Sequence, residues 1–171
     1  CLLSRGLGDV YKRQAVDRIA DLNAAGIDTI ICDHHQPGEI IPDAIAILDA
    51  KQEQCNYPYK ELCGCGVVYK LLQGFSLQQT INAYYLDEYI DLLATATCAD
   101  IVPMTGENRV LVQKGIEKLN TNPMIGFQAI LKKAGYGNEV NVRSIVFGFA
   151  PRINAAGRIS HAFGAVELLT A

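Results

Sequence analysis

The chain has 171 residues, of which half are apolar and 19% are charged, and its formal net charge is −3. This length and composition are typical of one globular domain and exclude an intrinsically disordered segment. The net charge excludes a global basic field that would drive non-specific nucleic-acid binding, although a short basic cluster can act locally. Apolar runs such as 27–32 and 142–151 are too short to span a bilayer, so we expect no membrane contact.

The first fourteen residues differ in character from those that follow. The segment begins at Cys1 without a methionine and lacks the charged, apolar and small regions of a secretory signal. A helical pattern starts only at Ala15, so we expect 1–14 to be foreign or misread sequence and the domain to occupy 15–171. Because the last helical pattern is still running at Ala171, we expect both ends to be cut.

The next part of the chain predicts an α/β arrangement. A helix is expected over Ala15–Ala25, and Gly26 is a natural stop for it. Ile27–Cys32 is rich in β-branched residues and indicates a buried strand, and Ala44–Leu48 indicates a second one. Helix followed by buried strand is the half-unit of parallel sheets, so we expect a parallel sheet flanked by helices.

From about Gly64 the pattern becomes mostly helical. Within one long expected helix, Ile81–Ala99, the four-residue spacing of Tyr85 and Tyr89 predicts that both face the core. Val142–Phe149 fits a strand or a helix equally well. The other expected helices are Val67–Phe75, Arg109–Asn120, Pro123–Ala134 and Ser160–Leu169.

Six cysteines are distributed without a clear metal-binding pattern. Cys32 and Cys98 lie in apolar runs and are expected in the core. Cys63 and Cys65 are one residue apart and lack a second pair at zinc-site spacing. We therefore expect reduced thiols and a cytoplasmic location.

Asp33, His34 and His35 come directly after the strand predicted over Ile27–Cys32. In open α/β sheets, ligands bind just beyond the carboxyl ends of strands. A carboxylate and two imidazoles there can hold a transition metal and contact a phosphate. A pair of surface histidines in a loop is the alternative, and the position at a strand end favours the metal site.

Asp100 is a second candidate ligand. It ends the long predicted helix, between Ala99 and the apolar pair Ile101-Val102. An acid in such a place needs a partner to offset its desolvation. A metal ion and a capping role in the turn before Pro103 both meet that need.

Taken together these stretches resemble the DHH phosphoesterases. Ile31-Cys32-Asp33-His34-His35 and the later Ala99-Asp100-Ile101-Val102-Pro103 resemble two motifs of that family. Two further stretches are similar to its RecJ branch of nucleases: Gly64-Cys65-Gly66-Val67-Val68-Tyr69-Lys70, and Pro151-Arg152-Ile153-Asn154-Ala155-Ala156-Gly157-Arg158. The resemblance covers Ala15 to Ala171.

The resemblance implies a role for each residue of the site. His34 and Asp100 would bind the same ion, and His35 would face the scissile phosphate. Asp33 would position the imidazoles, because ligating histidines usually donate their other N–H to a carboxylate or carbonyl. The implied chemistry is hydrolysis of a phosphodiester with two divalent ions, usually manganese, with magnesium as the alternative.

One departure from the family pattern bears on activity. Family members carry an Asp-x-Asp motif and an Asp-Cys-Gly turn upstream of the DHH triplet. No Asp-x-Asp precedes Asp33 here, and the Asp-Cys-Gly aspartate would fall near Val10. We therefore expect this chain to lack ligands for the second ion and to be inactive by itself.

Arg152, Asn154 and Arg158 form the cluster that we tie to substrate. A guanidinium binds phosphate with a planar fork, and an amide can donate to a phosphate oxygen. The alternative is that Arg152 and Arg158 pair with acids such as Glu167.

The resemblance implies that the intact parent degrades single-stranded DNA from the 5′ end in repair and recombination, with a helicase or single-strand-binding protein as partners. Two alternatives are kept: a DHH phosphodiesterase acting on cyclic dinucleotides or short RNA, and a non-catalytic nucleic-acid-binding module. Because a truncated sheet would expose apolar surface, we also expect self-association of this chain.

Overall fold

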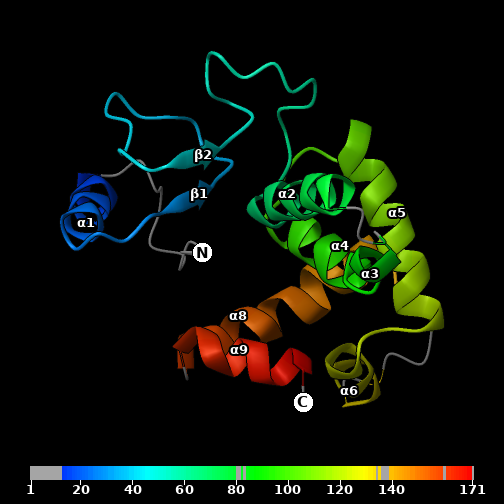
Figure 1. The fold of residues 1–171 in the computed structure, drawn as a ribbon. Helices are drawn as coiled ribbons and strands as arrows, with labels where there is room; N and C mark the ends of the chain where they lie inside the picture. Colours follow the sequence, from blue (N-terminus) through cyan, green and yellow to red (C-terminus); the bar gives the residue numbers. More distant parts are fainter. Residues whose placement is uncertain are drawn as a thin grey trace. The chain divides into compact units, whose positions relative to one another are not determined.

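The computed structural model describes residues 13–79, 82, 84–133, 135, 139–159 and 161–170 (Figure 1). The chain divides into two units, Cys1–Leu71 and Leu72–Ala171, and each is described by itself. Helix α2, Gly64–Gln78, begins in the first unit and ends in the second.

The first unit contains the expected helix and parallel strands. Helix α1, Arg13–Ala24, is followed by Gly26, whose φ of 72° turns the chain toward β1, Ile30–Cys32. Strand β2, Ala46–Leu48, pairs with β1 in parallel, with Ile31 opposite Ile47 and Cys32 opposite Leu48. The strands are shorter than the apolar runs predicted. The fold class expected from the sequence, α/β with a parallel sheet followed by a mostly helical section, is confirmed.

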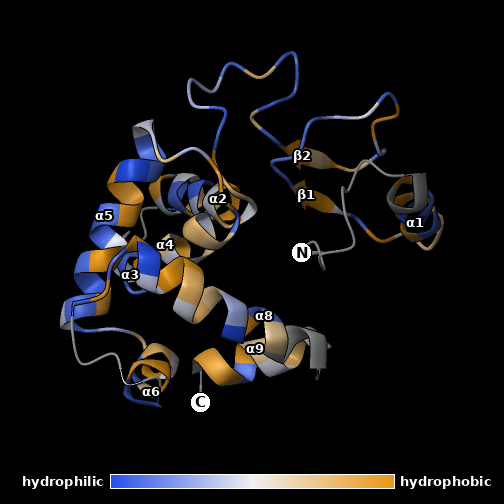
Figure 2. Cartoon of the chain, turned by 180° about the vertical axis from the view of Figure 1, so that it is seen from behind, coloured by the Kyte–Doolittle hydropathy of each residue, from blue (hydrophilic) through white to orange (hydrophobic). Residues whose placement is uncertain are grey.

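The two-stranded sheet buries little of its apolar surface among the described residues. The prediction of a buried strand over Ile27–Cys32 was wrong in part, because Ile31 is buried whereas Ile27 and Ile30 are 50% and 51% exposed. Figure 2 shows the strands in the orange of hydrophobic residues. The sheet therefore presents apolar side chains at its surface.

The second unit is helical. Helix α4 packs against α5, α6 packs against α9, and α8 packs against α9. The elements are α3 Tyr84–Asp87, α4 Ile90–Ala99, α5 Gly106–Thr121, α6 Ile125–Lys133, α7 Val142–Ser144, the π-helix η1 Ile145–Phe149, α8 Ala150–Ile159 and α9 His161–Thr170.

The prediction of one helix over Ile81–Ala99 with Tyr85 and Tyr89 facing the core was wrong. The structure has two helices there, α3 and α4, separated at residues 88 and 89. Tyr85 is 67% exposed and Tyr89 is 54% exposed. Once the helix breaks, a four-residue spacing no longer keeps two side chains on one face. Leu86 and Ile90 take the buried positions instead.

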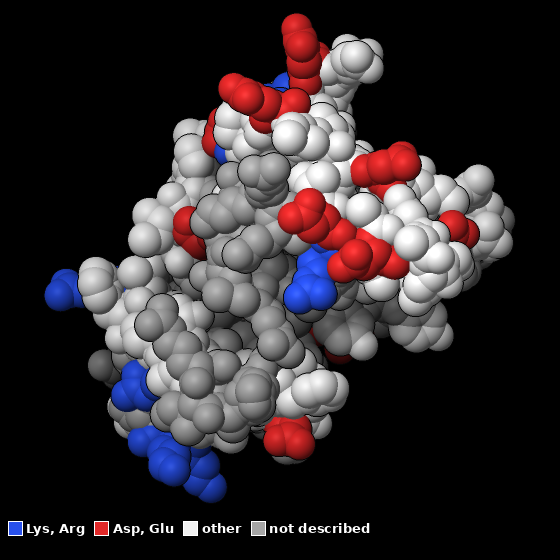
Figure 3. Space-filling model, turned by 90° about the vertical axis from the view of Figure 1, so that its left-hand side faces the viewer, with Lys and Arg blue, Asp and Glu red and all other residues white. Residues whose placement is uncertain are grey.

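Both acidic and basic side chains of the described residues are visible on the face that Figure 3 shows. This agrees with the formal charge of −3 and leaves local basic groups as the places for contacts with an anion.

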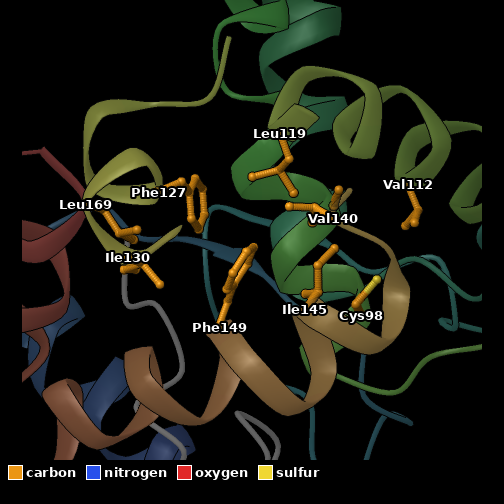
Figure 4. Packing of buried hydrophobic residues seen from close by; sticks show 10 residues of the cluster. Cys98, Val112, Leu119, Phe127, Ile130, Val140, Ile145, Phe149 and Leu169 are labelled. Atoms are coloured by element: carbon orange, nitrogen blue, oxygen red, sulfur yellow. The ribbon is translucent and has the colours of Figure 1, made fainter. Parts of the chain in front are cut away.

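The buried core of the second unit comes from α4, α5, α6, η1 and α9, together with Val140 just before α7 (Figure 4). Phe127 of α6 and Phe149 of η1 are fully buried, with ring centroids 6.0 Å apart. Cys98 lies in the same core, as predicted. The other members are Ala94, Val112, Leu119, Ile130, Val140, Ile145 and Leu169.

Two glycines permit close helix contacts in this unit. A Cβ on Gly115 of α5 would lie 2.3 Å from the Cβ of Ala94 and 2.4 Å from the Ile90 carbonyl oxygen of α4. A Cβ on Gly126 of α6 would lie 2.3 Å from the Leu168 carbonyl oxygen of α9. All three distances are far below van der Waals contact, so the backbones of these helices approach one another closely.

The ambiguous stretch Val142–Phe149 is helical, and part of it is a π-helix. Helices α7, η1 and α8 follow one another without a gap, and the Ala150 N–H donates to the Ile145 carbonyl, five residues back. Pro151 has no N–H, and in an α-helix its ring would clash with the carbonyl of Phe147. A wider turn just before it relieves that clash.

Candidate metal centre

Asp33 lies at the carboxyl end of β1. Its N–H donates to the Leu48 carbonyl of β2 at 3.0 Å, so the strand pairing fixes its backbone. Its residue surface is 2% exposed. The parallel sheet therefore buries a carboxylate at the edge where ligands of open α/β sheets bind.

One oxygen of Asp33 organises both histidines. Oδ1 accepts from the backbone N–H of His34 at 2.7 Å and of His35 at 3.2 Å. It also lies 2.6 Å from Nδ1 of the His35 ring. Because a carboxylate only accepts hydrogen bonds, this contact places the hydrogen on Nδ1. The other ring nitrogen of His35, Nε2, is then the one that can contact a ligand.

The three side chains form one group of potential metal ligands. The His34 and His35 rings have centroids 4.3 Å apart, and one ligand atom from each of the three residues lies within 4.8 Å of the others. Both histidines are half-buried. Imidazole nitrogen with carboxylate oxygen suits manganese, iron or zinc rather than calcium.

The second oxygen of Asp33 lacks a hydrogen-bond partner among the described residues, although it is buried. A buried carboxylate oxygen without a partner is costly. A cation at this oxygen would offset that cost, so the residues present fit a divalent metal ion.

The beginning of α2 lies beside His34. A Cβ on Gly64 would be 3.5 Å from Cδ2 of the His34 ring, so an alanine would still fit there.

Cys65 also lies in the first turn of α2. Burial raises its pKa to about 12, and the neighbouring Cys63 adds to the shift. Cys65 is therefore a neutral thiol at physiological pH.

Asp49 is a buried acid that the sequence analysis did not single out. It directly follows β2 as Asp33 follows β1, and it is 3% exposed. Its Oδ1 accepts from the Lys51 N–H at 2.8 Å, which holds the turn after the strand. An acid directly after an apolar strand was the signal available in the sequence.

Asp100, the predicted partner of His34, belongs to the second unit. It is exposed at the end of α4, where its N–H donates to the Ala96 carbonyl at 3.0 Å. The next residue, Ile101, has a φ of 58°, a left-handed conformation that is rare for a β-branched residue. The structure describes the two units separately, so joint binding of one ion by His34 and Asp100 stays a prediction.

The predicted substrate residues lie on α8. Arg152 and Asn154 are exposed, and Nη1 of Arg152 donates to the Gly148 carbonyl at 2.6 Å. Among the described residues, Arg152 thus contacts a carbonyl of η1 rather than an acid. The Arg158 side chain lies outside the described part of the chain.

Within the described ranges, no helix is both long enough and apolar enough to cross a membrane.

Comparison with known proteins gives a family match. The model of the DHH family, N-terminal domain, matches residues 7–97. This range contains the Asp33-His34-His35 group, both strands, and the helices α2 and α3.

Relatives and solved structures point to one kind of enzyme. The single-stranded-DNA-specific exonuclease RecJ of Bacillus subtilis is 42% identical over 84% of this chain, and that of Escherichia coli is 34% identical over 84% of it. A crystal structure of exonuclease RecJ bound to manganese covers 91% of this chain and 39% of its own, with 29% identity and a TM-score of 0.76. The crystal structure of RecJ from Thermus thermophilus in complex with Mg²⁺ matches with a TM-score of 0.68 and 29% identity, over 85% of this chain and 21% of its own.

The chain spans 18% of the Bacillus protein and 27% of the Escherichia coli protein.

Proposed function

Because the chain belongs to the DHH family, we propose that it is part of a metal-dependent exonuclease that hydrolyses single-stranded DNA from the 5′ end. The observation that carries the proposal is the buried Asp33, which binds His35 with one oxygen and leaves the other without a hydrogen-bond partner among the described residues. The relatives, which are named as single-stranded-DNA-specific exonucleases, favour this substrate over cyclic dinucleotides or short RNA. Roles in repair and recombination, a cytoplasmic location, and helicase or single-strand-binding partners follow from the resemblance and belong to the same proposal.

In this proposal His34 and Asp100 hold a divalent ion, manganese or magnesium. The fit rests on the donor set of the Asp33-His34-His35 group and on the buried Oδ2 of Asp33. When bound, such an ion supplies positive charge that stabilises the transition state of phosphodiester hydrolysis.

His35 is proposed to contact the scissile phosphate. Its Nδ1–H is held by Asp33, so the ring presents Nε2 in a fixed direction. A proton on Nε2 would let the ring donate to a phosphate oxygen and stabilise the charge that develops there. Asp33 would then act as a positioning residue.

Arg152, Asn154 and Arg158 are proposed to bind the DNA backbone. Nη1 of Arg152 donates one hydrogen bond to the Gly148 carbonyl, and the other four N–H groups of the guanidinium can donate to a phosphate. The hydrogen bond to the helix pre-orders the arginine, which lowers the entropy cost of binding.

The domain is proposed to comprise residues 15–171, and this chain is proposed to be inactive by itself. The support is the sequence, since no Asp-x-Asp precedes Asp33 to provide further ligands. The intact enzyme would supply the missing carboxylates.

Calorimetric titration with manganese tests the proposal. The wild-type chain should bind the ion, and His34→Ala should abolish binding. Glu39→Gln is the control, because it removes an exposed acid of the same unit outside the site. Equal binding by all three proteins would exclude a metal centre at His34.

A further inference from the structure

The helical stretch from α7 through η1 to α8 keeps one side in the core and the other in solvent. It runs without a gap from Val142 to Ile159. Ile145 and Phe149 are fully buried on the core side. The opposite side carries a phenylalanine that is 73% exposed, Phe147.

The residues around Phe147 form a stripe along the exposed side. Arg143, Phe147 and Pro151 are four residues apart and all exposed, so they lie roughly one above the other along the helix. Arg152 and Asn154 are exposed beside them. We call Arg143, Phe147, Pro151 and Arg152 the η1 stripe.

The η1 stripe is positively charged, whereas the whole chain is negatively charged. Residues 142–155 contain two arginines and no acidic residue, whereas the whole chain has a net charge of −3. The two arginines lie on either side of Phe147, about 13 Å apart along the helix axis at 1.5 Å per residue. An anionic polymer is thus the complementary partner, and the exposed aromatic ring between the cations suits one that carries flat rings.

We propose that Phe147 stacks on a nucleobase of single-stranded DNA while Arg143 and Arg152 contact the phosphates on either side of that nucleotide. The inference rests on the proposed function and adds two binding residues, Phe147 and Arg143, to it. Proteins that grip single strands combine cationic side chains along the backbone with aromatic side chains under the bases. Because every base has an aromatic face, Phe147 would hold DNA of any sequence.

Helical spacing explains why this phenylalanine is exposed. Ile145 and Phe149, the two ends of the π-turn, are fully buried, and Phe147, midway between them, lies on the opposite side of the helix and is 73% exposed. The same turn provides the Gly148 carbonyl that holds the Arg152 guanidinium at 2.6 Å. A hydrogen bond to the helix backbone therefore holds one cation of the η1 stripe, the Arg152 guanidinium.

The test compares two fluorescent ligands of equal charge. One is an oligothymidine of about 12 nucleotides, and the other is an abasic oligonucleotide of the same length, which keeps the phosphates and lacks the bases. Binding to the full chain is followed by fluorescence anisotropy over a series of salt concentrations. The variants are Phe147→Ala, Phe147→Tyr, Arg143→Ala and, as a matched control, Phe75→Ala, which removes a phenylalanine of α2 that is 51% exposed.

If Phe147 stacks on a base, its removal should weaken binding only of the ligand that carries bases. Phe147→Ala should weaken binding of oligothymidine about tenfold and leave binding of the abasic ligand unchanged. Phe147→Tyr should retain wild-type affinity, because a tyrosine ring also stacks. Arg143→Ala should weaken both ligands and lower the slope of log K against log salt by about one. Phe75→Ala should change neither ligand.

Two other results would overturn the inference in distinguishable ways. If the wild type binds oligothymidine and Phe147→Ala binds it equally well, or loses both ligands equally, base stacking at Phe147 is excluded and the proposed function stands. If the wild type binds neither ligand, the stacking role fails together with the proposal that this chain contacts DNA.

Discussion

Nδ1 of His35 lies 2.6 Å from Oδ1 of Asp33, and the same oxygen accepts the backbone N–H groups of His34 and His35. A single buried carboxylate oxygen therefore fixes the backbone of the histidine pair and the tautomer of one ring. The geometry follows from the position of Asp33 directly after β1, where strand pairing leaves the residue no freedom.

Asp33→Asn should weaken metal binding. An amide cannot accept three hydrogen bonds with the strength of a carboxylate, and its NH₂ group presents donors to the histidines. Loss of such a partner typically lowers metal affinity about 10- to 100-fold. Manganese affinity measured by calorimetry checks this, with the circular dichroism spectrum as the control for folding. An unchanged affinity in a folded variant would show that Asp33 does not order the site.

Cys65 should make stability depend on alkaline pH. Its pKa is raised to about 12 from an ordinary value of 9.0, so the unfolded chain loses this proton before the folded chain does. The contribution to the free energy of unfolding is therefore fully present below pH 9 and is lost as the pH rises toward about 12. Urea melts across that window should show that the free energies of unfolding of wild type and Cys65→Ser approach each other as the pH rises. A constant difference between the two proteins at all pH values would contradict the raised pKa of Cys65. Cys55→Ser is the control, because it removes a half-buried thiol elsewhere in the first unit.

Gly115→Ala should strongly destabilise the second unit. The new methyl group would lie 2.3 Å from the Cβ of Ala94, so α4 and α5 would have to separate. Overpacking of this kind costs about 1–3 kcal/mol. The matched control is Gly74→Ala in α2, where a Cβ meets nothing within 4 Å and the helix should gain about 0.5–1 kcal/mol. Thermal melts of the two variants should thus shift in opposite directions, and a shared direction would refute the close contact.

Ile101→Gly should stabilise the chain. Ile101 has a φ of 58° and is 83% exposed, so glycine relieves backbone strain and gives up almost no buried surface. Left-handed backbone costs a residue with a Cβ about 1–2 kcal/mol, part of which the greater freedom of glycine in the unfolded chain offsets. Denaturant melts should show a small gain for Ile101→Gly and none for Ile101→Val. A loss of stability in Ile101→Gly would mean that the isoleucine side chain makes a stabilising contact.

Two predictions that depended on a local pattern were confirmed by the structure. The β-branched residues before Asp33 predicted a strand that ends at the candidate ligands, and β1 ends at Cys32. The apolar surroundings of Cys98 predicted a core position, and it is 3% exposed. The same prediction for Cys32 was wrong, because Cys32 at the end of β1 is only half-buried. A strand end and an apolar run are properties of neighbouring residues, so they can be found from neighbouring residues.

Features that involve residues far apart in the sequence needed the tertiary structure. The amphipathic spacing of Tyr85 and Tyr89 favoured burial, yet the helix breaks between them and both are exposed, because burial depends on what packs against a face. Asp49 directly follows Leu48, which pairs with Cys32, so only the pairing of β1 with β2 puts it beyond the same end of the sheet as Asp33.

By itself the sequence determined the α/β class, the strand that ends at Asp33, and the family motifs, since these depend on local spacing and composition. The tertiary structure decided which Asp33 oxygen holds His35, where the π-turn before Pro151 lies, and which aromatic rings are exposed to solvent. Each of these depends on the positions of atoms that the fold brings together, and the periodicity of a sequence carries no information about such distances.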